Sequence, residues 1–207
     1  MKILAIGANG VIGQAVVEKL SQSHQVIAVG HSQGDLRVDI ESQESIRAMF
    51  ESVGVVDAII SMAGNGEMGS IKDMPSSGYA TVLKGKLMGQ VNLVRIGREY
   101  LKAGGSITLT SGQAANYPMA GTAAISIGVA GVNAFVGVAA LELEQGKRIN
   151  AVSPAVVKET LEQWGVDSAN GIPAAQVAEY YQHSVEGDKT GQIYNCLLYT
   201  SDAADDC

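Results

Sequence analysis

The sequence predicts a single α/β domain built on a doubly wound parallel sheet of about seven strands. Short apolar runs alternate with longer segments whose apolar residues recur at helical spacing, which is the pattern of parallel strands joined by crossover helices. Of the 207 residues, 46% are hydrophobic and 17% are charged, so the chain has enough apolar surface for one core. No repeat or low-complexity linker divides it.

The first strand and helix flank a glycine-rich turn. Residues 2–6 are an apolar run that ends at Gly7, and helical apolar spacing follows the turn. A strand that runs through glycines into a helix forms a phosphate cradle, because the helix N-terminus offers N–H groups to an anion. The pattern therefore predicts a Rossmann-like dinucleotide site, and the alternative is an ordinary strand–helix turn. The residues expected at this turn are Gly7, Asn9, Gly10, Val11, Ile12 and Gly13.

Three further strands and one helix are predicted in the first third of the chain. Residues 25–30 form the second strand, and the polar loop after it is too short for a helix, so a third strand follows at 37–40. Ser42 can cap a helix that runs to Val53, and residues 55–62 form the fourth strand.

The middle of the chain predicts two long helices around a fifth strand. The first helix runs from about Ser77 to Ala103, where Gly104-Gly105 end it, and residues 106–110 form the strand. The second helix ends near residues 145–146. No charged residue occurs from 103 to 141, and this uncharged segment is long enough to span a bilayer. Its composition of small residues favours a buried helix of a globular protein.

The last third predicts a sixth strand at 148–153, an irregular and mobile stretch at 159–172, a helix from Pro173 to about Val185, and a final strand at 192–195. Residues 196–207 break from this pattern and resemble the translation of a transposon-derived sequencing adapter. We therefore expect a domain over 1–195 and a non-native tail over 196–207; the alternative is a native flexible tail.

Charge excludes several classes of partner. The net charge is −7 and no basic run occurs, which argues against binding to nucleic acid or to an anionic membrane. The first residues lack the pattern of a secretory signal, so we expect a cytoplasmic protein. No metal site is expected.

The order of motifs resembles the short-chain dehydrogenase/reductase superfamily over residues 1–195. The matching elements are the glycine turn, Asp39 after the third strand, the Ser61–Gly64 turn, Thr110-Ser111 and Ser153-Pro154. The commonest family form has a glycine where this chain has Val11. The resemblance implies that the adenine, the adenosine ribose and the nicotinamide are held by Asp39, Ile40, Ser61, Ala63, Gly64, Pro154, Val156 and Val157.

The chemistry of that family rests on a serine, a tyrosine and a lysine four residues after the tyrosine. Ser111 stands at the serine position, but the other two positions fall at Ile125 and Val129, which cannot transfer a proton. The chain thus resembles a divergent subgroup without the tyrosine and lysine. Lys86 falls where the family has an auxiliary asparagine, and Tyr117 lies six residues after Ser111. Both are candidate proton donors beside Ser111.

The end of the second strand bears on the choice of cofactor. NAD specificity normally needs a carboxylate there, and the sequence instead has Gly30-His31-Ser32. We therefore expect NADP(H) rather than NAD(H), with His31 and Ser32 as donors to the 2′-phosphate; the nearby Asp35 is the argument against it.

Two functions remain open at this stage. One is an oxidoreductase acting on a small carbonyl or alcohol with an atypical active site. The other is a catalytically silent dinucleotide-binding sensor or partner-binding module. For either function, a homodimer or homotetramer through the two long helices is expected.

Overall fold

A computed structural model of the chain describes residues 1–64 and 66–197, and it confirms the single α/β domain. Seven parallel strands form one sheet in the order β3-β2-β1-β4-β5-β6-β7. The strand order reverses between β1 and β4, and ligands bind at such a switch point in open α/β sheets. The strands are β1 (Lys2–Ile6), β2 (Gln25–Gly30), β3 (Leu36–Arg37), β4 (Val56–Ser61), β5 (Leu101–Thr110), β6 (Arg148–Pro154) and β7 (Ile193–Cys196).

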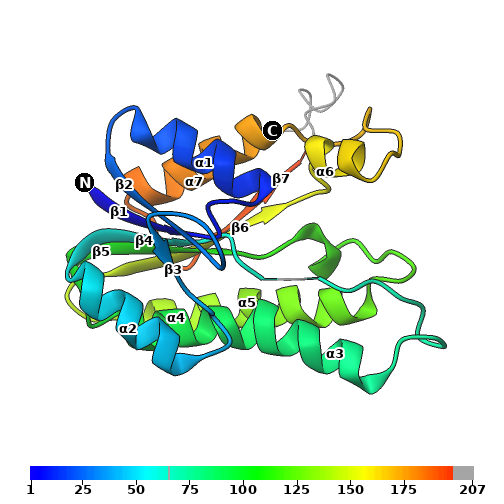
Figure 1. Ribbon diagram of the computed structural model, residues 1–207, viewed down its shortest axis with the longest axis horizontal. Helices are drawn as coiled ribbons and strands as arrows, with labels where there is room; N and C mark the ends of the chain where they lie inside the picture. The colour runs from blue at the N-terminus through cyan, green and yellow to red at the C-terminus, as the bar shows by residue number, and fades with distance from the viewer. Residues whose placement is uncertain (65, 198–207) are drawn as a thin grey trace.

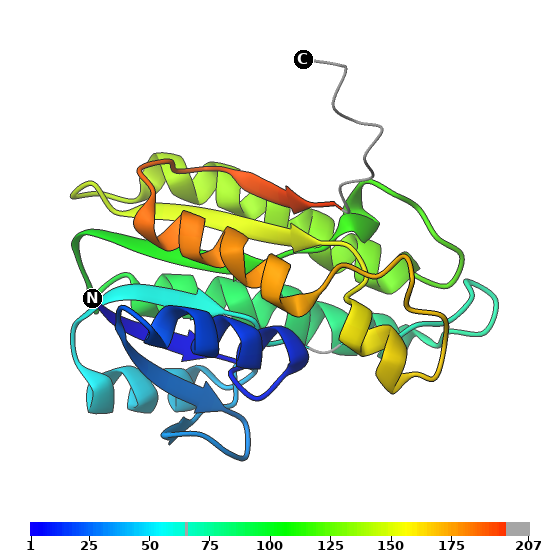
Figure 2. The same ribbon diagram turned by 90° about the horizontal axis from the view of Figure 1, so that it is seen from above.

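Helices cover both faces of the sheet (Figure 1). One face carries α1 (Val11–Ser21) and α7 (Ala174–Glu186), which lie side by side in Figure 2. The other face carries α2 (Gln43–Val53), α4 (Gln90–Gly97) and α5 (Ala123–Glu142). Each face has its own hydrophobic cluster, centred on Phe50 and Leu93 on one side and on Val16 and Tyr181 on the other.

Local sequence signals account for much of this architecture. The expected cap of α2 is confirmed: the Ser42 hydroxyl accepts a hydrogen bond from Ser45 N at 3.2 Å. The helix then buries Ile46, Met49 and Phe50 against the sheet. The loop between β2 and β3 contains no helix, as its length and polarity predict.

The predicted third strand is too long. The observed β3 ends at Arg37, whereas the sequence favoured strand structure to Ile40. The reason is a turn at Asp39, whose Oδ1 accepts the N–H of Glu41 at 2.9 Å while its own N–H donates to Ser45 Oγ at 3.0 Å.

The predicted helix from Ser77 to Ala103 is also wrong at its C-terminal end. The segment divides into α3 (Ser76–Val82), a π-helix η1 (Leu83–Gly89) and α4, which ends at Gly97. A Cβ on Gly97 would lie 2.6 Å from the Phe50 ring, so the helix packs tightly against α2 before the chain turns into β5. Gly104-Gly105 lie within β5, where the register with β4 shifts.

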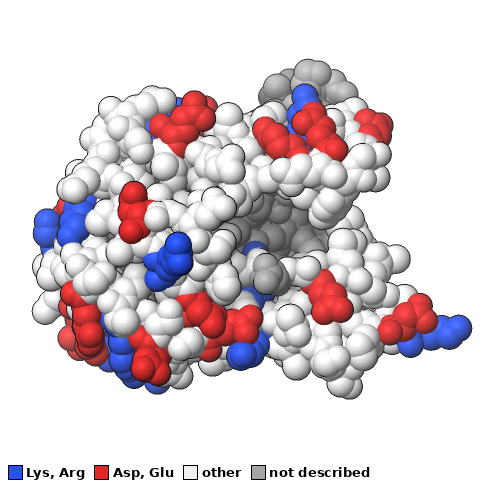
Figure 3. Space-filling view, in the orientation of Figure 1, with Lys and Arg blue, Asp and Glu red and all other residues white. Residues whose placement is uncertain are grey.

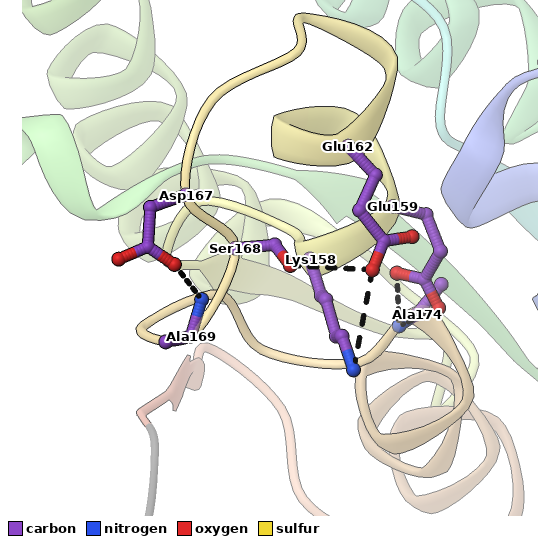
Figure 4. Close-up of polar contacts among 7 residues, drawn as sticks. All are labelled: Lys158, Glu159, Glu162, Asp167, Ser168, Ala169 and Ala174. Atoms are coloured by element: carbon purple, nitrogen blue, oxygen red, sulfur yellow. Dashed lines mark hydrogen bonds and ion pairs between the residues drawn. The ribbon is translucent and has the colours of Figure 1, made fainter.

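The stretch over 159–172 is not wholly irregular, because it begins with the helix α6 (Lys158–Gln163). Both carboxylate oxygens of Glu159 accept the N–H of Ala174, at 2.9 and 3.1 Å, and so cap the start of α7 (Figure 4). Val157 and Ile172 form a parallel bridge that closes the base of this α6 arm, which we define as residues 155–172.

The last strand extends one residue beyond the predicted strand at 192–195. Cys196 belongs to β7, is fully buried among residues of α1 and α7, and its carbonyl accepts the N–H of Ala155 at 3.2 Å. Burial also raises the pKa of its thiol to about 12. The rest of the expected non-native tail lies outside the described residues from 198 onward.

We expect truncation to separate these two parts of the tail. A chain that ends at Leu197 should keep the melting temperature of the full chain. A chain that ends at Asn195 should melt several degrees lower, because it loses buried Cys196, and each kcal/mol of stability corresponds to about 2–4 °C for a domain of this size. Equal melting temperatures for the two truncated chains, measured by calorimetry, would contradict this expectation.

Candidate functional site

The glycine turn is built from close backbone contacts. Gly7 has a φ of +87°, and a Cβ on it would lie 2.6 Å from Ala63 N in the turn after β4. A Cβ on Gly13 would lie 2.1 Å from the Gly7 carbonyl. Both residues are therefore required by the fold itself. Gly10 differs, since a Cβ there would meet its nearest neighbour at 3.6 Å.

Gly10 is the N-cap of α1, and no side chain caps this helix. The first N–H groups of a helix have no partners within the helix, and they form a partial positive charge. The turn therefore presents unpaired backbone N–H groups to an anion. The protein itself leaves room for a side chain at Gly10, so a bound ligand is what would exclude one. This arrangement fits the pyrophosphate of a dinucleotide.

A cleft of about 590 Å³ opens beside this turn, across the ends of β1, β2 and β4. The lining includes nine of the predicted cofactor residues: Gly7, Asn9, Gly10, His31, Ser32, Asp39, Ile40, Ala63 and Gly64. It also includes Ile6, Gly30, Val38, Glu41, Met62 and Gly85, which were not among the predicted cofactor residues. The remaining predicted residues are outside this lining: Val11, Ile12, Gly13, Ser61, Pro154, Val156 and Val157.

The rim of the cleft at the end of β2 has exposed donors, and the carboxylate of its loop is bonded to the backbone of β2. His31 and Ser32 are exposed, whereas the Asp35 carboxylate accepts the N–H of Ala28 at 2.9 Å. Asn9 Nδ2 donates to the carbonyl of Gln33 at 2.9 Å and joins this loop to the glycine turn. The Asp35 carboxylate thus has one backbone hydrogen bond, and it remains the argument against NADP(H).

The two acidic residues in the cleft are also engaged. Asp39 accepts from the backbone of Glu41, and Glu41 forms an ion pair of 2.8 Å with Lys84. The hydrogen bond with Glu41 raises the pKa of the exposed Lys84. A phosphate at the rim would thus meet carboxylates that already have partners.

The segment expected at the nicotinamide lies at the base of the α6 arm. Pro154 ends β6, and its carbonyl lies 4.0 Å from the position of a Cβ on Gly112, so this segment is next to Ser111-Gly112. The N–H of Ile172 donates to Val156 O at 3.0 Å and fixes the path of the arm. Figure 3 shows the molecule hollowed on this side, between the α6 arm and the loops after β4 and β5.

Ser111 and α5 form an apolar wall of the site. Ser111 is buried, and its hydroxyl donates to the Val129 carbonyl at 3.1 Å. Val129 is itself buried against Gly112, and the side chain of Ile125 lies 3.1 Å from the position of a Cβ on Gly66. These positions therefore carry packing side chains and have no group that can exchange a proton.

Lys86 enters the same region from η1. Its Cδ lies 2.9 Å from the position of a Cβ on Gly64, which lines the cleft, and its Cγ lies 3.6 Å from that position on Gly128 of α5. The residue is half-buried, and its ammonium group has no hydrogen bond or ion pair with another described residue. Burial lowers the pKa of this amine to about 8.

Tyr117 is placed differently from the other two candidates. It follows the short helix η2 (Gln113–Ala115), its backbone N–H donates to Gln113 O at 2.8 Å, and the residue is 57% exposed. Within residues 1–64 and 66–197, no hydrogen bond joins its hydroxyl to Ser111 or Lys86. The structure therefore places the stem of Lys86 against Gly64 of the cleft lining and leaves Tyr117 on the surface.

One residue of the site gave no sequence signal. Gln90 is fully buried and connects η1 with the end of β5. A polar residue within the helical spacing of residues 77–103 reads as solvent-facing, and the burial of Gln90 follows from the wide turn of η1. No cluster of three or more His, Cys, Asp or Glu that could hold a metal occurs among the described residues.

Comparison with known proteins identifies relatives of this architecture. The family profile described as "Enoyl-(Acyl carrier protein) reductase" matches residues 3–204. Versicolorin reductase 1 of Dothistroma septosporum is 29% identical over 160 residues, which are 73% of this chain and 61% of that protein. This chain thus spans about 61% of the length of the curated relatives it matches.

Solved structures extend the similarity over nearly the whole chain. The protein lin1944 from Listeria innocua is 39% identical, with a TM-score of 0.91, over 96% of this chain and 100% of that chain. A small-chain dehydrogenase in complex with NADPH is 26% identical, with a TM-score of 0.84, over 95% of this chain and 96% of that chain.

Replacement of the open glycine tests the proposed phosphate contact. Gly10→Ala should melt like the unmodified chain, because its Cβ meets no close neighbour in the protein. The same variant should bind NADPH about tenfold more weakly or worse, a loss of ~1.4 kcal/mol. Fluorescence titration with NADPH measures the affinity.

Gly13→Ala is the matched comparison for that variant, because its Cβ would lie 2.1 Å from the Gly7 carbonyl and the protein itself should lose stability. Unchanged NADPH affinity in folded Gly10→Ala would show that the phosphates lie elsewhere.

Proposed function

Because this chain belongs to the short-chain dehydrogenase/reductase superfamily, we propose that it is an NADP(H)-dependent oxidoreductase of a small carbonyl or alcohol, with Lys86 as its proton donor. The observation that carries the proposal is the placement of Lys86. Its side chain lies between Gly64 of the cofactor cleft and Gly128 of α5. The side chain thus enters the region where Ile125 and Val129 replace the usual acid and cation.

Reduction of a carbonyl needs a hydride on carbon and a proton on oxygen. NADPH supplies the hydride when it is bound. The chain must then supply the proton, and neither Ile125 nor Val129 can do so. The hydroxyl of Ser111 donates to Val129 O, and its oxygen still has acceptor capacity, so Ser111 can orient a group but has no free proton to give.

The environment of Lys86 suits an acid that works near neutral pH. A general acid is most effective when its pKa lies near the working pH. Burial without a counter-charge lowers the pKa of Lys86 to about 8, so the amine is still mainly protonated at pH 7 and can also be regenerated. The pKa of the neighbouring Lys84 is shifted the opposite way, upward, because Lys84 is exposed and paired with Glu41.

The cofactor preference is proposed from the rim at the end of β2. Exposed His31 and Ser32 can donate to a 2′-phosphate, and Asp35 holds the backbone of β2. The NADPH bound to one similar dehydrogenase is consistent with this choice. The same proposal includes two further contacts. Pro154 to Val157 lie at the nicotinamide, and Ser61 lies near the ribose.

The alternative function is a dinucleotide-binding sensor or partner-binding module without turnover. It is favoured by the packed side chains of Ile125 and Val129 and by the bond that occupies Ser111. Binding of NADPH without any carbonyl reduction would support this alternative.

We also propose that the protein works in the cytoplasm as a homodimer or homotetramer that pairs the exposed face of α5. Ile127, Ala130, Ala134, Val138 and Leu141 form an exposed apolar stripe at helical spacing. By length and composition α5 could cross a membrane, so the stripe needs a cover of some kind.

A groove of about 630 Å³ between α2, α4 and α5 favours a second copy over lipid as that cover. Its six charged side chains form no ion pairs within the described part of the chain, so a partner with the same surface could pair them across a two-fold axis. They are Arg47, Arg95, Arg98, Glu51, Glu99 and Glu142.

Substitution of Lys86 tests the proton donor. Lys86→Met should lower NADPH-dependent reduction across a panel of small carbonyls by roughly 10²–10⁴-fold, the contribution of a positioned acid, and should leave NADPH binding intact. The rate of the unmodified protein should fall as the pH rises through about 8, because the protonated amine is the active form.

Lys84→Met is the matched control for that variant, two residues away and exposed, and it should keep kcat at saturating NADPH. A Lys86→Met protein with the full rate would exclude this role, and Tyr117→Phe would then test the other candidate.

A charge at the rim should change the cofactor preference. We expect His31→Asp to weaken NADPH binding by about tenfold or more, because a carboxylate repels the 2′-phosphate and accepts from ribose hydroxyls. Ser23→Asp places the same charge at the opposite end of β2 and should leave both affinities unchanged. Tighter binding of NADH than NADPH by the unmodified protein, in paired titrations, would overturn the preference.

Light scattering tests the assembly. Val138→Glu places a charge on the apolar stripe at a residue that is 55% exposed, and we expect it to convert the oligomer to monomers. Val55→Glu is the control, since Val55 is 52% exposed but lies before β4 and away from α5. A monomeric mass for the unmodified protein at micromolar concentration would refute the proposed assembly.

A further inference from the structure

The helical segment between β4 and β5 contains an unusual turn at the site. Residues 83–89 form the π-helix η1 between two α-helices, and Lys86 lies at its centre. Such wide turns are uncommon and often occur at functional sites. The wide turn changes which donors reach the carbonyl of Lys86.

The side chain of Gln90 supplies one of those donors. Gln90 Nε2 donates to Lys86 O at 2.9 Å, a carbonyl that would accept the backbone N–H of Gln90 in a regular α-helix. The same nitrogen donates to Thr110 O at 2.9 Å, and Gln90 Oε1 accepts the N–H of Thr110 at 2.9 Å. Both amide protons and the amide oxygen are therefore used.

These three bonds join the two candidate groups of the active site. Thr110 ends β5 and directly precedes Ser111, and Lys86 is the proposed acid. We propose that Gln90 is a positioning residue that fixes Lys86 relative to Ser111 by clamping the backbone of η1 to the end of β5. This inference rests on the proposed role of Lys86.

The chemistry of the contact favours an amide over the packing residues that surround it. Burying an amide costs desolvation free energy unless its polar groups form hydrogen bonds, whereas a leucine would fill the same space without that cost. The glutamine is therefore explained by its hydrogen bonds and not by packing alone. A carboxylate could accept from Thr110 N, but it has no protons for the carbonyls of Lys86 and Thr110. A glutamine is thus the side chain that satisfies all three backbone groups.

The charged groups near Lys86 do not provide another means of holding its amine. Described residues of α5 carry no charge from Ala123 to Leu141. The carboxylates of the cleft are those of Asp39 and Glu41, and they bond to the backbone of Glu41 and to Lys84, respectively. The position of the amine therefore depends on its backbone and on its packing against Gly64 and Gly128.

Thr110 offers a matched control from the opposite face of the sheet. Its hydroxyl bonds to the Tyr181 hydroxyl of α7 at 2.6 Å and to the Ser61 carbonyl at 2.6 Å. Tyr181→Phe removes a buried hydrogen bond to the same residue without touching η1. It should lower the melting temperature and leave Lys86 undisturbed.

The test measures the pH dependence of Lys86 labelling by acetic anhydride, read by peptide mass spectrometry, in Gln90→Leu, Gln90→Met and Tyr181→Phe. In the unmodified protein the midpoint should lie near 8. Both Gln90 variants should raise the midpoint by about one pH unit, because the freed amine moves toward water. They should also lower kcat by about tenfold at unchanged NADPH affinity.

The inference is overturned if the Gln90 variants keep the midpoint of the unmodified protein, or if Tyr181→Phe shifts it equally. Gln90→Met is unbranched and uncharged, so it serves as the folded variant if Gln90→Leu does not fold. Failure of the proposed function gives a different result: Lys86→Met would retain the full reduction rate, whereas the labelling midpoint would still respond to Gln90.

Discussion

The contact between the glycine turn and the turn after β4 is the constraint on which the cleft depends. Backbone meets backbone there, since a Cβ on Gly7 would lie 2.6 Å from Ala63 N and a Cβ on Gly13 would lie 2.1 Å from Gly7 O. Because no side chain fits between these segments, the floor of the cleft is made of main-chain groups. The helix N-terminus at Gly10 is thereby held open beside the switch point of the sheet.

The opposite wall of the site is organised by buried hydrogen bonds at the end of β5. Thr110 forms hydrogen bonds with Gln90 on one face of the sheet and with Tyr181 on the other, and both partners are fully buried. Burial raises the pKa of Tyr181 well above its ordinary value, so this hydroxyl stays protonated and serves as a structural hydrogen-bonding group. Polar groups in such a setting specify one arrangement, because any displacement leaves a buried donor or acceptor without a partner.

Local sequence patterns predicted most of the fold because strands and amphipathic helices have their own periodicity. The errors occur where a distant contact overrides that pattern. Helix α4 ends at Gly97, where it packs closely on Phe50, the Glu159 carboxylate stabilises an arm that looked irregular, and Cys196 enters β7. The glycine turn and the rim at His31 were visible in the sequence for the same local reason. The role of Gln90 was not, because a π-turn and a clamp across twenty residues leave no periodic signal.

In the proposed function, Lys86 on η1 takes the place of a proton donor on α5, where the corresponding residues are apolar. A lysine on α5 itself would have to replace Val129, which is buried against Gly112 and Ser111. A lysine on η1 instead passes its aliphatic chain over Gly64 and Gly128, two positions without side chains. The apolar stem then packs in the wall against these two glycines. Without a counter-charge, burial alone sets its protonation, so the same packing that positions the amine also adjusts its acidity.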